Sequence, residues 1–307
     1  MHQPTLDEAV ARWVLQSVGP ESQISRVTPL AGATSSSLYR IGIEGRDRAY
    51  SVVLRLFTDN EWLRHEPDLA LHEAASLGRA GEVSVPTPEL IAFDEDGASC
   101  RTPAVLMTEV PGAVDLRPRD LDAWLDRMAE ALVAVHRVAA TTFPWTYRIY
   151  NDVRRLQPPA WSSLTDLWSE AIRLAQGPPP PVRPVFIHRD YHPVNVLWEN
   201  DRLSGIVDWV NACRGPAGID VGHCRLNLAL VSGVDTANAF LAHYQARAGQ
   251  RFDYHPYWDV LSMLEFLPGP PEVYRGWLDF GLTHLTPALV QQRLEDYLLS
   301  LVACWRG

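Results

Sequence analysis

Four polar residues in the second half of the chain have types and a spacing that suit phosphoryl transfer. They lie in the stretch VFIHRDYHPVNVLWENDRLSGIVDW, where His188, Asp190 and Asn195 form the pattern H-x-D-x-x-x-x-N and Asp208 follows. In phosphoryl transfer a carboxylate takes the proton of the attacking hydroxyl, and amide and carboxylate oxygens hold magnesium on the nucleotide phosphates. The pattern therefore predicts Asp190 as the catalytic base and Asn195 and Asp208 as magnesium ligands.

A predicted hairpin explains how the two magnesium ligands would meet. Two strand-like segments flank the turn signal Asn200-Asp201. In a two-residue hairpin closed by Asp201 and Arg202, Asn195 and Asp208 are cross-strand neighbours, near enough to share one cation. The strands are expected at residues 195–199 and 203–208.

Each of these residues also has an ordinary structural interpretation. An Asp after a short apolar strand is often a buried turn residue, and a His in a loop more often braces it than performs chemistry. For Asp190 the company of His188, Asn195 and Asp208 favours catalysis. His188 is a candidate catalytic residue, and its alternative role is to hold the loop by hydrogen bonds. His192 is a second candidate for holding the loop.

The composition excludes several classes of protein. With 307 residues, 47% hydrophobic and 21% charged, the chain is an ordinary globular protein. Its net charge of −10 argues against a nucleic acid partner. No residue is lysine, so a Walker A phosphate loop is excluded. We see no signal peptide and no apolar run of membrane-spanning length, and the four cysteines form no C-x-x-C pair. We therefore expect a cytoplasmic protein without a membrane partner.

The order of the patterns predicts an α+β protein with two lobes. Strand-like segments and a helix fill residues 1–109, which we expect to form an antiparallel nucleotide-binding lobe. The breaker Val110-Pro111-Gly112 follows, and residues 110–307 are mainly helical. This larger lobe would hold the catalytic loop and the substrate-binding helices.

In the first lobe, one cation and one acid are predicted to pair. Arg55 lies amid VVLRLF on a central strand, where a planar guanidinium suits phosphate oxygens. Glu73 shares a helix stripe with Leu69 and Leu77, so it points inward and requires a cationic partner. Glu66 is the rival partner, weakened by the proline beside it.

A loop of small residues precedes this strand. The stretch AGATSS lets backbone amides approach a phosphate, and hydroxyl groups add donors. Most loops of this kind are plain turns, and only its position before Arg55 suggests a phosphate-binding role. Its candidate residues are Gly32, Thr34, Ser35 and Ser36.

Together these residues resemble the aminoglycoside phosphotransferase family, the small-molecule branch of the protein-kinase-like fold. The resemblance covers about residues 27–220. It rests on the segments VLRL, LHEAASL, VPTPEL, LMTEVPG, LVAVHRV, HRDYHPVN, VDW and GPAGID, in that order along the chain. Two departures are an Arg at position 55, where many members have Lys, and a phosphate loop with a single glycine.

The resemblance implies a nucleotide site and a reaction. ATP, with GTP as an alternative, and Mg²⁺ would be the cofactors, and the linker LMTEVPG would place Met107, Glu109 and Val110 at the nucleotide. Asp220, in GPAGID, would fix the loop after the metal site and would not itself bind metal. The short interval between Asp208 and Asp220 leaves no room for an activation loop, which disfavours a protein kinase.

The acceptor is open at this stage. The resemblance implies a hydroxyl of a small molecule, either an antibiotic or a related amino sugar or amino alcohol. The alternatives are an ordinary metabolite, such as a choline-like compound or a sugar alcohol, and a nucleotide-binding pseudokinase scaffold. Among scattered acids and aromatic residues of the last third, Asp259, Glu265 and Trp258 are the acceptor-binding candidates. No pattern predicts the oligomeric state.

Overall fold

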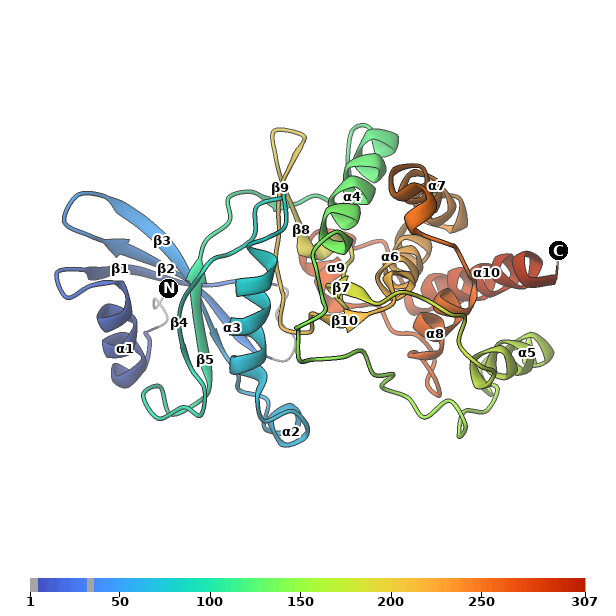
Figure 1. The fold of residues 1–307 in the computed structure, drawn as a ribbon, viewed down its shortest axis with the longest axis horizontal. Helices are drawn as coiled ribbons and strands as arrows, with labels where there is room; N and C mark the ends of the chain where they lie inside the picture. The colour runs from blue at the N-terminus through green and yellow to red at the C-terminus, as the bar shows by residue number, and fades with distance from the viewer. Residues whose placement is uncertain (1–4, 32–35, 307) are drawn as a thin grey trace. The chain divides into compact units, whose positions relative to one another are not determined.

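A computed structural model describes residues 5–31 and 36–306, and the chain divides into two compact units (Figure 1). Unit 1 comprises Met1–Gly112 together with Ser204–Asn211, and unit 2 comprises Ala113–Leu203 together with Ala212–Gly307. The segment that carries Asp208 thus belongs to the first unit, although it follows Asp190 and Asn195 in the sequence.

Unit 1 is built around a five-stranded antiparallel sheet in the order β1-β2-β3-β5-β4. The register aligns Arg55 in β3 with Leu38 in β2 and Val105 in β5. The elements are α1 (Glu8–Val18), β1 (Gln23–Pro29), β2 (Ser37–Glu44), β3 (Ala49–Leu56), α2 (Asn60–His65), α3 (Leu69–Ala80), β4 (Leu90–Asp94) and β5 (Ala104–Thr108).

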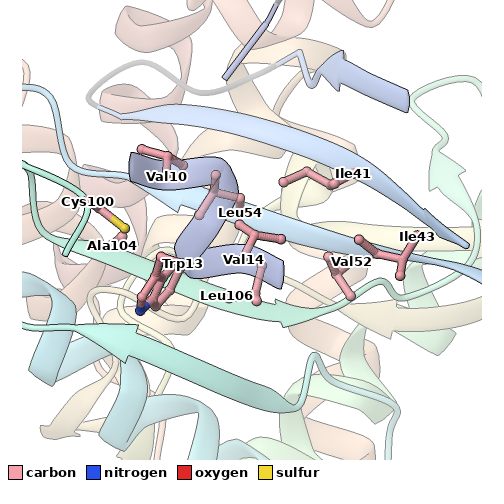
Figure 2. Packing of buried hydrophobic residues seen from close by; sticks show 10 residues of the cluster. All are labelled: Val10, Trp13, Val14, Ile41, Ile43, Val52, Leu54, Cys100, Ala104 and Leu106. Atoms are coloured by element: carbon pink, nitrogen blue, oxygen red, sulfur yellow. The ribbon is translucent and has the colours of Figure 1, made fainter. Parts of the chain in front are cut away.

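The two faces of this sheet bury different chemistry. Toward α1, the sheet contributes Val52 and Leu54 to an apolar core that also contains Trp13 and Val14 (Figure 2). Because successive strand residues point to opposite faces, Arg55 points away from that core and toward α3. The face covered by α3 is therefore where a charged pair can form.

Unit 2 is mainly helical. Its helix α6 is buried on nearly all sides and packs against α7, α8 and α10. Gly218 and Gly222 allow close packing, because a Cβ at Gly218 would lie 2.3 Å from Trp258. The helices are α4 (Leu121–His136), α5 (Thr165–Gln176), α6 (Ala217–Ser232), α7 (Val234–Ala248), α8 (Tyr257–Leu264), α9 (Arg275–Asp279) and α10 (Pro287–Arg306).

Two small sheets and two short 3₁₀ helices complete the fold. One sheet pairs β7 with β10, and the other has the order β6-β8-β9. The bounds are β6 (Ala113–Val114), β7 (Val185–Ile187), η1 (Pro193–Asn195), β8 (Val196–Glu199), β9 (Arg202–Ile206), β10 (Cys213–Gly215) and η2 (Gly249–Arg251). In the described ranges, no helix combines the length and apolar character needed to cross a membrane.

The predicted hairpin exists, but its turn and strand ends differ from the prediction. Asn200 and Asp201 form the turn, with φ angles of 53° and 59°, and Arg202 is already the first residue of β9. Asn and Asp tolerate this left-handed conformation and favour it in two-residue hairpins. Asn195 ends η1 instead of starting a strand, and Asp208 lies beyond β9 with a φ of 69°. The prediction that both residues lie in paired strands is therefore wrong.

The predicted fold class is confirmed. The chain is an α+β protein with an antiparallel N-terminal sheet and a mainly helical C-terminal region. Helix α1 begins after Asp7, whose side chain accepts a hydrogen bond from the Ala9 N–H, as expected for an N-cap residue.

Candidate active site

In unit 2, Asp220 shapes the loop that carries Asp190. Its carboxylate accepts the backbone N–H groups of His188 and Arg189, both at 2.7 Å, and lies 3.0 Å from Nε2 of His136. Arg189 has a φ of 73°, a conformation that an L-residue keeps only when its surroundings hold it. The prediction placed Asp220 on the loop after the metal site, whereas its hydrogen bonds hold the backbone that precedes Asp190.

The partners of Asp220 also decide its ionisation. The side chain is fully buried, and burial alone would raise its pKa. The hydrogen bond and charge of His136, with smaller contributions from His188, outweigh burial and lower the pKa of Asp220. A buried carboxylate with charge-assisted donors on both oxygens stays ionised.

Asp190 lies at the end of this loop with a donor at each carboxylate oxygen. Nε2 of His223 is 3.0 Å from Oδ1, and Nδ2 of Asn195 is 3.1 Å from Oδ2. Nε2 of His192 is farther from Oδ1, at 3.8 Å. Burial would raise the pKa of Asp190, but His192, His223 and His188 together hold it well below its usual range. The side chain is 32% exposed, so an ionised carboxylate is available to a substrate.

Asn195 is oriented as a metal ligand requires. Its Nδ2 donates to the backbone oxygen of Asp190 at 2.9 Å as well as to the carboxylate. The amide oxygen therefore faces away from Asp190, where it can accept a bond or coordinate a cation. Oxygen donors of this kind are those that Mg²⁺ prefers. Separately, Asp190, His192 and His223 have ligand atoms within 4.8 Å of one another and could also hold a metal ion.

In unit 1, Arg55 joins two carboxylates. Its Nε lies 3.1 Å from Oε2 of Glu73, and its Nη2 donates to Oδ1 of Asp208 at 2.8 Å. A weaker bond of 3.3 Å runs from Nη1 to Oγ of Ser36. The predicted pairing of Arg55 with Glu73, and not with Glu66, is confirmed.

The Glu73 carboxylate has fewer hydrogen-bond donors than that of Asp220. Its contact with Arg55 is an ion pair without hydrogen-bond geometry, and neither of its oxygens accepts a hydrogen bond from the described residues. Burial raises the pKa of Glu73 to about 7, Arg55 lowers it, and the nearby charge of Asp208 raises it further. Glu73 therefore shares a single cation with a competing acid.

The end of β9, two residues before Asp208, is anchored within unit 1. The N–H of Ile206 donates to the Pro86 oxygen at 3.0 Å. A Cβ at Gly205 would lie 2.4 Å from the Val110 side chain, so only glycine allows this approach. Asp208 is one-third exposed at 34%, and with one oxygen on Arg55 it retains a second oxygen for a cation. Its donor chemistry also fits Mg²⁺.

The other predicted nucleotide residues are placed as follows. Met107 is buried in β5, Val110 packs on Gly205, and Glu109 forms an ion pair with Arg40. Their role at a nucleotide remains a prediction. Gly32, Thr34 and Ser35 lie outside the described residues.

His188 and the acceptor candidates are mostly structural. His188 is fully buried with its ring edge against Tyr191, which fits a loop brace. Asp259 is also buried, with Oδ1 2.7 Å from both Arg225 and the Tyr297 hydroxyl.

Trp258 fills the space left by the α6 glycines. Asp259 and Trp258 are both buried against partners that are distant in sequence. Their contact with an acceptor remains a prediction.

Glu265 is partly exposed but already paired. Its Oε1 accepts from Arg189 at 2.8 Å. The Arg189 guanidinium lies between two aromatic rings, 4.9 Å from the Tyr147 centroid and 4.6 Å from that of Tyr150. An acceptor amine would therefore compete with Arg189 for this carboxylate.

Sequence reasoning missed His223. It follows Asp220 by three positions in α6, and residues at this spacing share one helix face. A helix face that brings Asp220 to the loop must also bring His223 there. The three-residue spacing between Asp220 and His223 could therefore have identified His223 from the sequence.

Two comparisons relate the chain to known proteins. A family model described as the phosphotransferase enzyme family (APH) matches residues 26–264. No curated protein sequence matches the chain significantly.

Several solved structures share the fold. A protein of Ralstonia eutropha JMP134 classed as an aminoglycoside phosphotransferase has a TM-score of 0.62 at 16% identity, covering 96% of this chain and 99% of that chain. A thermostable mutant of aminoglycoside phosphotransferase APH(4)-Ia, bound to ADP and hygromycin B, has a TM-score of 0.61 at 15% identity, covering 95% and 98%. Macrolide 2'-phosphotransferase MphH from Brachybacterium faecium has a TM-score of 0.56 at 16% identity, covering 88% and 91%. Likeness at these identities shows the fold alone.

Proposed function

Because the chain belongs to the phosphotransferase enzyme family, we propose that it transfers the γ-phosphate of ATP to a hydroxyl of a small molecule. The chain is a small-molecule phosphotransferase with a kinase-like fold, and the proposal concerns its donor, its metal and its acceptor. ATP is the proposed donor because APH(4)-Ia, which shares the fold, was solved with ADP. The proposed location is the cytoplasm, where ATP is supplied.

The observation that carries the proposal is the environment of Asp190. Donors on both oxygens keep the carboxylate ionised and oriented, and about a third of the side chain is exposed. An ionised, oriented carboxylate can accept the hydrogen bond of an acceptor hydroxyl and receive its proton as the new O–P bond forms. Asp190 is therefore the proposed catalytic base, and His188 holds the loop.

Magnesium, when bound, neutralises charge on the nucleotide phosphates. Asn195 and Asp208 are its proposed ligands, because both have an oxygen directed away from their protein partners. Arg55 is the proposed phosphate cation, with Glu73 holding its guanidinium in place. Ser36 and the linker residues Met107, Glu109 and Val110 remain proposed nucleotide contacts, as do Gly32, Thr34 and Ser35.

The acceptor is proposed at the level of chemical class. Of the expected acids, Asp259 is buried and Glu265 is paired with Arg189. His192, His223 and Tyr274 are the rings grouped near Asp190. This environment favours a hydroxyl compound of low positive charge, such as a macrolide or a neutral metabolite, over a polycationic aminoglycoside.

A panel screen tests the proposal. ADP release would be followed with MgATP and with aminoglycosides, macrolides, amino alcohols or sugars, for the wild type, Asp190→Asn and the control Asp296→Asn. Asp296 is an exposed acid of α10. We expect one acceptor class to stimulate ADP release, a loss of roughly 10²–10⁴-fold in Asp190→Asn, and no change in the control.

Two results would contradict the proposal. Nucleotide binding without stimulation by any acceptor would indicate a pseudokinase scaffold instead of an enzyme. Turnover by Asp190→Asn at the wild-type rate would show that another group receives the proton.

A further inference from the structure

His223 stands on the same helix face as the residue that shapes the catalytic loop. Asp220 binds the backbone of that loop at His188 and Arg189, and His223, one turn later in α6, reaches the Asp190 side chain. A single rigid helix thus holds both the backbone and the carboxylate. The family pattern H-x-D-x-x-x-x-N does not include this histidine.

The donors of Asp190 divide between its two oxygens. His223 lies at Oδ1, at 3.0 Å, and Asn195 donates to Oδ2, at 3.1 Å. Rotation about the last bond of an Asp side chain is otherwise broad, with shallow preferences. Two donors on opposite oxygens stop this rotation. Each carboxylate oxygen accepts about two hydrogen bonds, so one position on each oxygen stays open for a substrate hydroxyl.

The surroundings of His223 make it a donor at Nε2. The side chain is 18% exposed, and its Nδ1 is buried without a hydrogen-bond partner in the part of the chain that the structure describes. A proton on Nδ1 would therefore be costly, whereas a proton on Nε2 meets the Asp190 carboxylate. The neutral ring and the charged ring both carry the Nε2 proton, so the contact does not depend on the charge of the ring.

His192 is less suited to the same task. Its Nε2 lies 3.8 Å from Oδ1, beyond hydrogen-bond distance, and its ring packs edge-on against the rings of His223 and Tyr274. It supports the ring of His223 and does not hold the carboxylate itself.

We propose that His223 is a positioning residue that holds Oδ1 of Asp190, so that the carboxylate meets the acceptor hydroxyl in one orientation. The inference rests on the proposed function, since it presumes that Asp190 receives the proton. It adds a requirement that the family pattern lacks: a donor three residues after Asp220.

The test compares two side chains of nearly equal size at position 223. His223→Gln keeps an N–H donor near the place of Nε2, and His223→Met removes it. His243→Met is the matched control, because His243 in α7 also contacts an Asp, with Nε2 2.8 Å from Asp122. The probe is MgATP alone, with hydrolysis followed as phosphate release, and the wild type and Asp190→Asn are run in parallel.

We expect His223→Met to lower kcat by about 10–100-fold, since small misplacement of a catalytic group costs this much. The KM for ATP should stay within about twofold, because ATP binding does not use His223. Gln at 223 should restore most of kcat, and the control should match the wild type. A His223→Met enzyme with the wild-type kcat would overturn the inference.

A second measurement uses the wild-type protein and does not depend on enzyme activity or on the folding of a variant. Nitrogen-15 NMR of the histidine rings in the wild-type protein, at about pH 8, should show the proton of His223 on Nε2. A proton on Nδ1 with a bare Nε2 would overturn the inference. Failure of the proposed function looks different: wild type and Asp190→Asn would then hydrolyse ATP equally, while the NMR result stands.

Discussion

Glu73 in unit 1 and Asp220 in unit 2 are both fully buried carboxylates, yet their pKa values move in opposite directions. Burial raises the pKa in both cases, so burial alone cannot explain the contrast. Asp220 accepts two backbone N–H groups at 2.7 Å and contacts His136. Glu73 has one ion pair with Arg55, whose guanidinium also binds Asp208.

The comparison shows that the number of donors per carboxylate decides the charge. Each hydrogen bond from a fixed N–H stabilises the ionised form and offsets part of the desolvation cost. Asp220 has enough donors to remain charged, which suits a residue that holds a loop. Glu73 and Asp208 divide one guanidinium, and the pKa of Glu73 rises to about 7. The charge of Glu73 therefore changes near neutral pH, whereas Asp220 stays ionised there.

The strongest way to break this contrast is Asp220→Asn. The amide has one acceptor oxygen, and its NH₂ group would face a backbone N–H or the His136 ring, leaving buried donors unpaired. We expect the free energy of unfolding at neutral pH to fall by about 3–5 kcal/mol, measured by urea denaturation. Asp296→Asn is the control.

The pH dependence of this loss has a definite sign. A lowered pKa means that Asp220 adds stability above its unfolded pKa of about 4, and loses that contribution as pH falls through its folded pKa. The difference between wild type and variant should therefore shrink in acid. A loss below about 1 kcal/mol at neutral pH would show that the donors do not govern Asp220.

Asp208→Ala tests the unit 1 half of the comparison, because Asp208 shares Arg55 with Glu73. The change removes a proposed magnesium ligand, so the affinity for ATP in the presence of Mg²⁺ should fall by about 100-fold, or about 2.7 kcal/mol. Calorimetry with and without Mg²⁺ measures this, with Asp47→Ala, an exposed acid of unit 1, as control. The change also leaves Arg55 to Glu73 alone, so the pKa of Glu73 should fall. An unchanged affinity for ATP with Mg²⁺ would remove Asp208 from the metal site.

Glu73→Gln has the smallest expected effect. With the folded pKa of Glu73 near 7 and an unfolded value of about 4.3, the folded state holds more protons between these values, so wild-type stability falls as pH rises. The variant lacks this slope. We expect its stability relative to the wild type to increase by about 1–2 kcal/mol from pH 5 to pH 7 in urea denaturation. An equal slope in both proteins would mean that Glu73 titrates in the ordinary range.

Much of the fold and part of the site followed from local patterns. The periodicity of the strands and helices predicted the α+β class and the N-terminal sheet. The inward stripe of Glu73 and the strand position of Arg55 predicted their pairing, now seen at 3.1 Å. These predictions succeeded because side-chain direction within a helix or strand depends only on local geometry.

Other features depended on tertiary contacts. Asp259 has the same side chain as a substrate-binding acid, and only the packing of α6, α8 and α10 shows that Arg225 and Tyr297 occupy it. The predicted strand ends of the hairpin were wrong, because moving a turn by one residue changes every opposed pair of the two strands. Residue type had marked Asn200-Asp201 as the turn, but the opposed pairs were counted from a hairpin closed one residue later, at Asp201 and Arg202.

The sequence by itself singled out the loop that carries Asp190 and Asn195, because the residue types and their spacing lie within one short stretch. It also indicated which face of their elements Arg55 and Glu73 occupy. Only the tertiary structure decided that His223 reaches Asp190, that Asp208 shares Arg55 with Glu73, and that Asp220 contacts His136, since these partners come from segments distant in the chain. Charge state and orientation depend on those partners, and a linear pattern does not contain them.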